Sequence, residues 1–299
     1  MSSDGTHARP PLSVVVSITH EWQEIARCVA PLLRQAEEIG AEVILADAIG
    51  NPARADWSSN VVHLNLAGMS VFGARAVGLH HATGAVLATT EDHCIVHDGW
   101  CEGIIRAHEQ LPEVDAVTGA FENGSPKHAL DWANFFLIFG PFVRPSGVPG
   151  LTRPPVPANL SIKRRVVTPA IQTEGHFEFA LVPRLYAIGS VRFEPNIVVS
   201  HVQSLGLAGF IRSHFHNSRA CVSLRPGGAT RGRTRRLTSR LGLPARLLSG
   251  ALTPVRTAPA LRWKAIASAP LILVLAFGAI LGAIAGNLAG PGNSAHGVH

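Results

Sequence analysis

The stretch LSVVVSITHEWQEIARCVAPLL, residues 12–33, decides the fold class of this chain. Residues 12–18 form a continuous, β-branched apolar run, which is typical of a strand buried on both faces of a sheet. After residue 21 the apolar side chains of Ile25, Val29 and Leu32 recur at helical spacing. A buried strand that leads at once into a helix predicts an α/β domain.

The same alternation continues for about a hundred residues. The sequence predicts further strands at 42–46, 61–64, 85–89 and 115–119, and helices at 70–82 and 99–111. Short connections of this kind favour right-handed crossovers, so we expect a mostly parallel sheet flanked by helices. Ligands bind at the carboxyl ends of such strands. Asp47 and the run Glu91-Asp92-His93 fall at two of these ends.

The segment 132–157 interrupts the pattern, because it is rich in aromatic residues, glycine and proline. It is too irregular to predict a regular element, and we expect a loop over the site or a segment that dips into a membrane. A second ordered region follows, with a helix around 177–188 and a strand around 197–201.

Charge divides the chain into two parts. Residues 1–194 contain 14 Lys and Arg against 20 Asp and Glu, whereas residues 195–299 contain 12 Lys and Arg and no acidic residue. Such a basic tail favours an anionic neighbour, either phospholipid or nucleic acid. The basic run has no interleaved aromatic residues and no recognisable reader motif, so we expect an anionic membrane and no nucleic acid.

The tail also contains the run LILVLAFGAILGAIAGNLA, residues 271–289, which has no charged residue. As a helix it would span about 28 Å, close to a hydrocarbon core, so we predict a transmembrane segment within residues 265–290. A buried helix of a soluble core is the alternative. The cations precede this segment, and residues 1–11 lack an apolar signal region. We therefore expect the body on the cytoplasmic side of the cell inner membrane.

Three glycines of this segment, Gly278, Gly282 and Gly286, recur every four residues and share one helix face. Small residues on one face let helices approach closely, which favours a homo-oligomer or packing on a second membrane segment. Simple tolerance of glycine in a lipid-facing helix is the alternative.

Five stretches of the chain resemble the family 2 glycosyltransferases of GT-A fold over roughly residues 12–225. They are the opening stretch, EVILAD ending at Asp47, GARAVGLHHATGAVLATTEDHC (73–94), VPANLSIKRR (156–165) and GHFEFALVPRLYAIGSVRFEPNIVVSH (175–201). The resemblance implies an inverting enzyme that moves a sugar from a nucleoside-diphosphate-sugar donor to an acceptor hydroxyl. A membrane location favours a lipid-linked or saccharide-linked acceptor.

The resemblance also implies roles for particular residues. Glu178 would be the general base that takes the acceptor proton, with Glu174 as the runner-up. A divalent cation on Glu91, His93 and His201 would neutralise charge on the donor diphosphate. Nitrogen ligands shift the preference from Mg²⁺ toward Mn²⁺.

The remaining positions implied by the resemblance would bind the nucleotide sugar: Thr19, Glu21, Asp47, Arg75 and Asp92. The chain departs from the family pattern in two places, with Glu-Asp-His in place of Asp-x-Asp and with Ala76 in place of an asparagine. These departures motivate the alternative of a non-catalytic GT-A-like membrane scaffold or partner of a polysaccharide synthase. A nucleotidyltransferase would need a glycine-rich phosphate loop after the first strand, and SITHEWQE contains no glycine.

The expected organisation follows from these features. A disordered N-terminus (1–11) precedes the GT-A domain (12–225), and a basic membrane-surface neck (226–264) follows it. The transmembrane segment (265–290) and a short tail (291–299) complete the chain.

Overall fold

The computed structural model of the protein describes residues 9–144, 154–225 and 243–297. Most of the predicted disordered N-terminus, part of the predicted loop and the arginine-rich first part of the predicted neck (226–242) lie outside the described residues.

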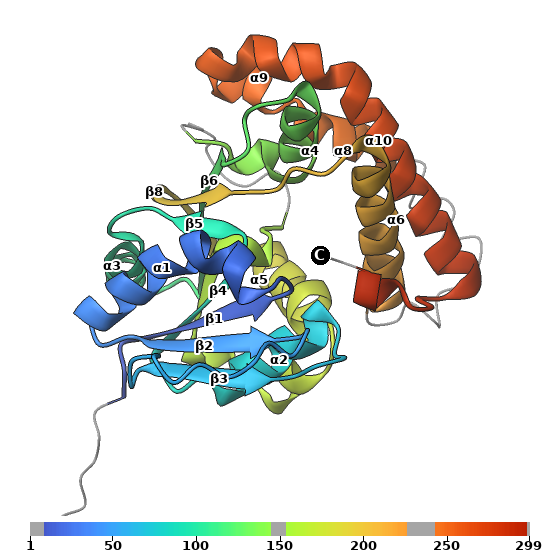
Figure 1. Ribbon diagram of the computed structural model, residues 1–299. Coiled ribbons are helices and arrows are strands. Elements are labelled where there is room, and N and C mark those ends of the chain that lie inside the picture. The colour runs from blue at the N-terminus through green and yellow to red at the C-terminus, as the bar shows by residue number, and fades with distance from the viewer. Residues whose placement is uncertain (1–8, 145–153, 226–242, 298–299) are drawn as a thin grey trace, which may run out of the picture.

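Eight strands of the described residues form one sheet in the order β3-β2-β1-β4-β7-β6-β8-β5 (Figure 1). Their bounds are β1 Leu12–Ile18, β2 Glu42–Asp47, β3 Val61–Asn65, β4 Val86–Glu91, β5 Cys94–Val96, β6 Ala116–Asn123, β7 Leu160–Lys163 and β8 Val191–His201. The helices are α1 Trp22–Glu38, α2 Val71–His81, α3 Trp100–Gln110, α4 Ala129–Phe139, α5 Val182–Ala187, α6 Leu207–Ser223, α8 Leu243–Ala251, α9 Pro254–Thr257 and α10 Arg262–Ala289.

The sheet is mixed, although its first four strands are parallel as predicted. Strands β3, β2, β1 and β4 pair in parallel, and so do β6 and β8. Strand β7 runs antiparallel between β4 and β6, and β5 runs antiparallel to β8. Because β7 is antiparallel to both of its neighbours, β4 and β6 point in the same direction. The carboxyl ends of β1, β4 and β8 therefore reach the same edge of the sheet.

The core confirms the fold read from the opening stretch. Strand β1 is buried along its whole length. On one face, Val14 packs in the same cluster as Ile25 and Val29 of α1, and on the other face Val15 packs with Leu79 of α2. Helices therefore cover both faces of the strand, which is why apolar side chains point to both faces and every position is buried.

The prediction of an irregular segment at 132–157 is wrong for its first part. Residues up to Phe139 belong to helix α4, which begins with a reciprocal capping box between His128 and Asp131. Phe135, Phe136 and Phe139 of this helix are almost completely buried. The sequence of α4 shows no clear helical periodicity because the helix is apolar on nearly every side, as expected of a helix that is buried all round.

The C-terminal helix α10 lies along α6, away from the sheet (Figure 1). By length and composition, the apolar helical stretch Pro259–Ala289 could cross a membrane, and 44% of its most apolar window is buried inside the structure. A Cβ added to Gly278 or Gly286 would lie 2.9 or 2.6 Å from a backbone oxygen of α6. The glycine face therefore packs closely as predicted, but its partner is α6 of the same chain and not a second copy.

Candidate active site

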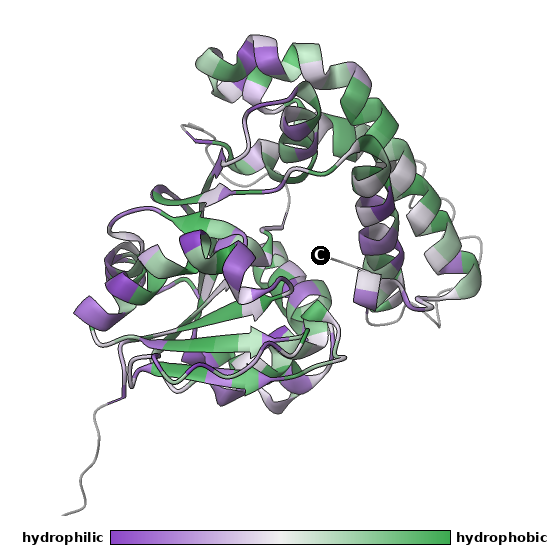
Figure 2. Ribbon diagram, in the orientation of Figure 1, coloured by the Kyte–Doolittle hydropathy of each residue, from purple (hydrophilic) through white to green (hydrophobic). Residues whose placement is uncertain are grey.

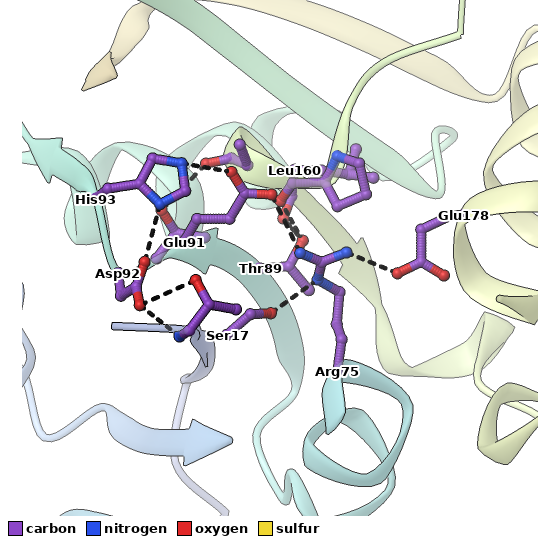
Figure 3. A network of polar contacts seen from close by, with 12 residues as sticks. Ser17, Arg75, Thr89, Glu91, Asp92, His93, Leu160 and Glu178 are labelled. Carbon is purple, nitrogen blue, oxygen red and sulfur yellow. Dashed lines mark hydrogen bonds and ion pairs between the residues drawn. The ribbon is translucent and has the colours of Figure 1, made fainter. Parts of the chain in front are cut away.

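A cluster of ionisable side chains lies at the carboxyl edge of the sheet (Figure 3). Strand β4 ends at Glu91 and continues into Asp92 and His93, and strand β8 ends at His201. Helix α2 contributes Arg75 from the side. A single π-helical turn, Phe177–Leu181, contributes Glu178.

Three of these residues point ligand atoms at one another. His93 Nε2 lies 3.0 Å from His201 Nε2 and 3.4 Å from Glu91 Oε2, and His201 Nε2 lies 4.0 Å from the same oxygen. Ligand atoms about 2.1 Å from a divalent cation stand roughly 3 Å apart in neighbouring positions of an octahedron. The two imidazole nitrogens and one carboxylate oxygen therefore fit a divalent cation, in the set that the sequence predicted.

Asp92 has a different position from the one expected of a nucleotide ligand. Its carboxylate is fully buried and accepts hydrogen bonds from the backbone nitrogens of Thr19 (2.5 Å) and His20 (2.9 Å). His93 Nδ1 lies 2.8 Å from the other oxygen. Asp92 thus holds the turn after β1 and orients the His93 ring, so that Nε2 faces the ligand cluster. The predicted contact between Asp92 and the nucleotide sugar stays a prediction.

The surroundings shift the pKa values of His93 and His201 in opposite directions. Burial and then the neighbouring His93 hold the pKa of His201 well below the usual range, so His201 is neutral and able to bind a metal. Burial also opposes protonation of His93, but the hydrogen bond with Asp92 and the charge of Glu91 outweigh it and raise the pKa of His93. Burial likewise opposes ionisation of Asp92, but hydrogen bonds from His20 and His93 hold its pKa well below the usual range.

Arg75 connects the ligand cluster to the candidate base. Its side chain is only 2% exposed and donates through Nε to Ser17 Oγ (3.0 Å). Nη2 donates to Glu91 Oε1 (3.2 Å) and Nη1 to Glu178 Oε1 (2.7 Å). The guanidinium therefore bridges two carboxylates inside the protein, where the resemblance implied a contact with phosphate. Arg75 thus holds Glu91 and Glu178 relative to each other, and its predicted contact with the donor stays a prediction.

Glu178 has the surroundings of a general base. Its side chain is 5% exposed, and Oε2 is buried with no hydrogen-bond partner among the described residues. Burial raises the pKa of Glu178, although the adjacent Arg75 opposes the rise. One carboxylate oxygen is thus anchored and the other is free to accept a proton. The runner-up, Glu174, is exposed and accepts a hydrogen bond from Ser70.

Asp47, another predicted nucleotide contact, lies apart from this cluster. The carboxylate of Asp47 is fully buried and accepts hydrogen bonds from the backbone nitrogens of Ile49, Gly50 and Asn51, so it holds the turn after β2. His63 Nε2 lies 3.0 Å from the same carboxylate. The carboxylate oxygens of Asp47 are therefore engaged within the protein, and the predicted contact with the nucleoside stays a prediction.

Glu21 is exposed just before α1, so its side chain faces solvent. Thr19 lies at the cluster, but its backbone nitrogen is taken by Asp92. Sequence reasoning also missed Ser17 and His20, which hold Arg75 and Asp92. Ser17 is the second-to-last residue of β1, and His20 lies two residues after its end. A polar residue near a strand end is the signal that could have found them.

The sheet has a mixed α/β, GT-A-like architecture, with acidic and imidazole groups at its carboxyl edge. A family model, described as glycosyl transferase family 2, matches residues 13–166, and the chain belongs to this family. The protein is therefore a glycosyltransferase, as the resemblance predicted. A search of curated protein sequences finds no match.

Among solved structures, the chain is similar to a mannosyltransferase, PcManGT from Pyrobaculum calidifontis, in complex with GDP-Man and Mn²⁺. The identity is 16%, over 95% of this chain and 88% of that chain, with a TM-score of 0.48. It is also similar to GalNAc-T7 with UDP, GalNAc and Mn²⁺, at 16% identity over 71% of this chain and 51% of that chain, with a TM-score of 0.45. A third similar structure is S. aureus TarS 1-349, at 10% identity over 92% and 90% of the chains, with a TM-score of 0.38.

Proposed function

We propose that this glycosyltransferase inverts the anomeric carbon of a nucleoside-diphosphate sugar, with Glu178 as the general base. The observation that carries the proposal is the buried, unpartnered Oε2 of Glu178, whose other oxygen is held by Arg75. A base must have a free oxygen that can reach the acceptor hydroxyl, and its carboxylate must be held in place.

The reaction is a single displacement. The acceptor oxygen attacks the anomeric carbon while its proton moves to Glu178 Oε2, and the bond between that carbon and the diphosphate oxygen breaks. The electron pair of this bond leaves with the nucleoside diphosphate. Arg75 supports the step by keeping Glu178 ionised against the effect of burial.

The candidate metal ligands are Glu91, His93 and His201. A divalent cation bound there would supply positive charge to the diphosphate leaving group. Two imidazole ligands favour Mn²⁺ or a related transition metal over Mg²⁺, which prefers oxygen ligands. Asp92 supports this set by fixing the His93 ring through Nδ1.

We further propose that the enzyme works at the cytoplasmic face of a cell inner membrane, on a lipid-linked or saccharide-linked acceptor. The supporting features are the apolar helix α10 and the absence of acidic residues after Glu194. An enzyme held at a membrane meets membrane-linked acceptors by diffusion in two dimensions, which increases the rate of encounter.

The experiment is nucleoside-diphosphate release by the purified full chain, with a panel of sugar nucleotides and either Mn²⁺ or Mg²⁺. Glu178→Gln should lower turnover by about 10²- to 10⁴-fold, the usual contribution of a general base, with little change in donor affinity. Glu174→Gln is the matched control, because Glu174 is an exposed carboxylate four residues away. It should keep full turnover.

The possible outcomes separate the parts of this proposal. Full turnover by Glu178→Gln would show that Glu178 is not the base. Retention of the donor's anomeric configuration in the product would contradict inversion. Failure of the native protein to bind any nucleotide sugar would favour a non-catalytic scaffold.

A further inference from the structure

Helix α10 has two faces of different character. One face carries the large apolar side chains that are most exposed on this helix, and we call it the α10 stripe: Trp263, Ile266, Leu273, Val274, Phe277, Leu281, Ile284 and Leu288. Apart from the neighbours Leu273 and Val274, these positions recur at spacings of three, four and seven residues, so they lie on one face of the helix. Figure 2 shows the apolar character of α10 beside the more polar α6. The opposite face, which includes the three glycines, is buried on α6.

Both ends of α10 are attached to the body of the enzyme. Near its start, the ammonium of Lys264 lies 4.2 Å from the ring centre of Trp132 on α4, and Ile272 belongs to the main core. After its end, Ala295 packs in one cluster with Val71 and Phe72 of α2. A helix that crossed a bilayer would leave its two ends on opposite sides, about 30 Å apart across the hydrocarbon.

Helix α6 excludes an upright arrangement in a second way. It follows α10 closely, and it is tied to the far end of α10 by a hydrogen bond from Arg219 Nε to the Gly290 oxygen (2.8 Å). Arg212 and Asn217 of α6 are exposed. An upright α10 would take these polar groups into hydrocarbon, where charged side chains are strongly unfavourable.

Building on the membrane attachment proposed above, we propose that α10 lies in the plane of an anionic membrane surface and does not cross it. The α10 stripe enters the headgroup and acyl boundary, and α6 with the rest of the body supplies the water-facing side. Arg256 and Arg262 are exposed around the start of the stripe, where they meet anionic headgroups. No acidic residue of the described part of 195–299 opposes this contact.

If α10 does not cross the membrane, the residues after α10 lie on the same side of the membrane as the body, and this is the first test. Asn293→Cys, exposed after α10, and Gln110→Cys, exposed on α3, are placed separately in a Cys221→Ser background. Inside-out vesicles of the expressing cell are treated with a membrane-impermeant maleimide. We expect both cysteines to react from the same side. Labelling of Asn293→Cys only from the side opposite to Gln110→Cys would overturn the proposal.

The occupant of the stripe is tested with purified protein and vesicles of phosphatidylcholine with phosphatidylglycerol. Phe277→Ser and Leu281→Ser should each raise the vesicle Kd about tenfold, since each removes one large side chain from the boundary. Ile188→Ser is the matched control, because Ile188 is 65% exposed on the body. It should bind as the native protein does.

Two other results would overturn the proposal. Unchanged vesicle binding by both stripe variants would show that the stripe does not enter the membrane. Conversion of a dimer to a monomer by Phe277→Ser, without a change in vesicle binding, would show that a second copy covers the stripe. Nucleoside-diphosphate release in detergent measures sugar transfer separately, so failure of one proposal does not imply failure of the other.

Discussion

Asp92 is a buried carboxylate that orients the candidate metal site without being one of its three ligands. It connects the turn after β1 to His93 through hydrogen bonds on both of its oxygens. The altered Glu-Asp-His run therefore has a physical explanation. Glu91 and His93 present ligand atoms, and the residue between them orients the histidine.

Asp92→Asn should weaken binding of Mn²⁺ by about 10- to 100-fold, because the His93 ring loses its orienting carboxylate. The measurement is metal affinity by titration calorimetry of the full chain, with melting temperature as a check on folding. Glu174→Gln, an exposed carboxylate outside the cluster, serves as the control. Equal affinity in Asp92→Asn and the native protein would contradict the assignment.

Arg75 should control the acid side of the pH–rate profile. Removing its positive charge with Arg75→Gln raises the pKa of Glu178 further, because Arg75 now opposes the effect of burial. A base must be ionised, so the variant should lose activity at a higher pH than the native enzyme as the pH falls. The measurement is the pH dependence of kcat/KM. If kcat/KM falls at the same low pH in Arg75→Gln as in the native enzyme, Arg75 does not control the pKa of Glu178.

Two buried histidines should make the fold sensitive to acid. Burial lowers the pKa of both His108 and His214 to about 4, and for His108 the charges of Lys163 and Arg165 add to the effect. An unfolded histidine titrates near about 6.5, so the unfolded state gains protons first as the pH falls. The free energy of unfolding should be level above about pH 6.5 and should fall by up to about 1.4 kcal/mol per pH unit per histidine toward pH 4.

The measurement is denaturant unfolding across this pH range, with His108→Gln as the test variant. The glutamine amide can keep a hydrogen bond to Ser161 but takes up no proton, so the fall with pH should be shallower by one histidine's share. His80→Gln, at an exposed position on α2, should leave the slope unchanged. An identical slope in His108→Gln and the native protein would remove His108 as the cause.

At the scale of elements, the contact between α6 and α10 depends on the absence of side chains. A Cβ at Gly282 would collide with the backbone oxygen of Phe215, which is fixed in α6. Close approach of two helices through small residues is therefore a requirement of this packing, as in the glycine faces of membrane helices. Here the partner of the face comes from the same chain.

Gly282→Ala should lower the free energy of unfolding by about 1–3 kcal/mol, the usual cost of overpacking. Gly103→Ala is a control of opposite sign, because its Cβ would meet Ile197 at 3.4 Å and it lies in helix α3. Replacing a helical glycine by alanine there should stabilise by about 0.5–1 kcal/mol. Thermal unfolding in detergent compares both variants, and stabilisation by Gly282→Ala would contradict the packing.

At the scale of the molecule, an acidic body is joined to a basic C-terminal part. Because α6 packs on α10, we propose that the helices after β8 act as one unit and that the predicted boundary after residue 225 does not separate an independent anchor. Such a unit would present its apolar face and its cations to the same surface.

The combined variant Arg256→Gln and Arg262→Gln should weaken binding to vesicles that contain phosphatidylglycerol. The expected loss is about 30-fold, since each of the two cations near an anionic surface contributes about 1 kcal/mol. Binding to pure phosphatidylcholine should change little. Arg106→Gln, exposed on α3, is the control, and equal binding by the combined variant would show that charge does not guide attachment.

The sequence alone was sufficient for strands β1, β2, β3, β4 and β6, for helices α1, α2 and α3, and for the family. Apolar periodicity is a local property, so β1 and α1 can be recognised from residues 12–33 alone. The family resemblance, now confirmed, also indicated Glu91, His93, His201 and Glu178 as candidate site residues.

Other features depended on tertiary contacts that no local pattern encodes. Arg75 is bound to a carboxylate 103 positions later in the chain, and Asp92 to a turn 73 positions earlier. The antiparallel pairing of β7 with β4 and β6 is likewise a contact between distant segments. So is the packing of the glycine face of α10 on α6. Periodicity shows that a face is buried but not what covers it, because burial depends on which segments the folded chain brings together.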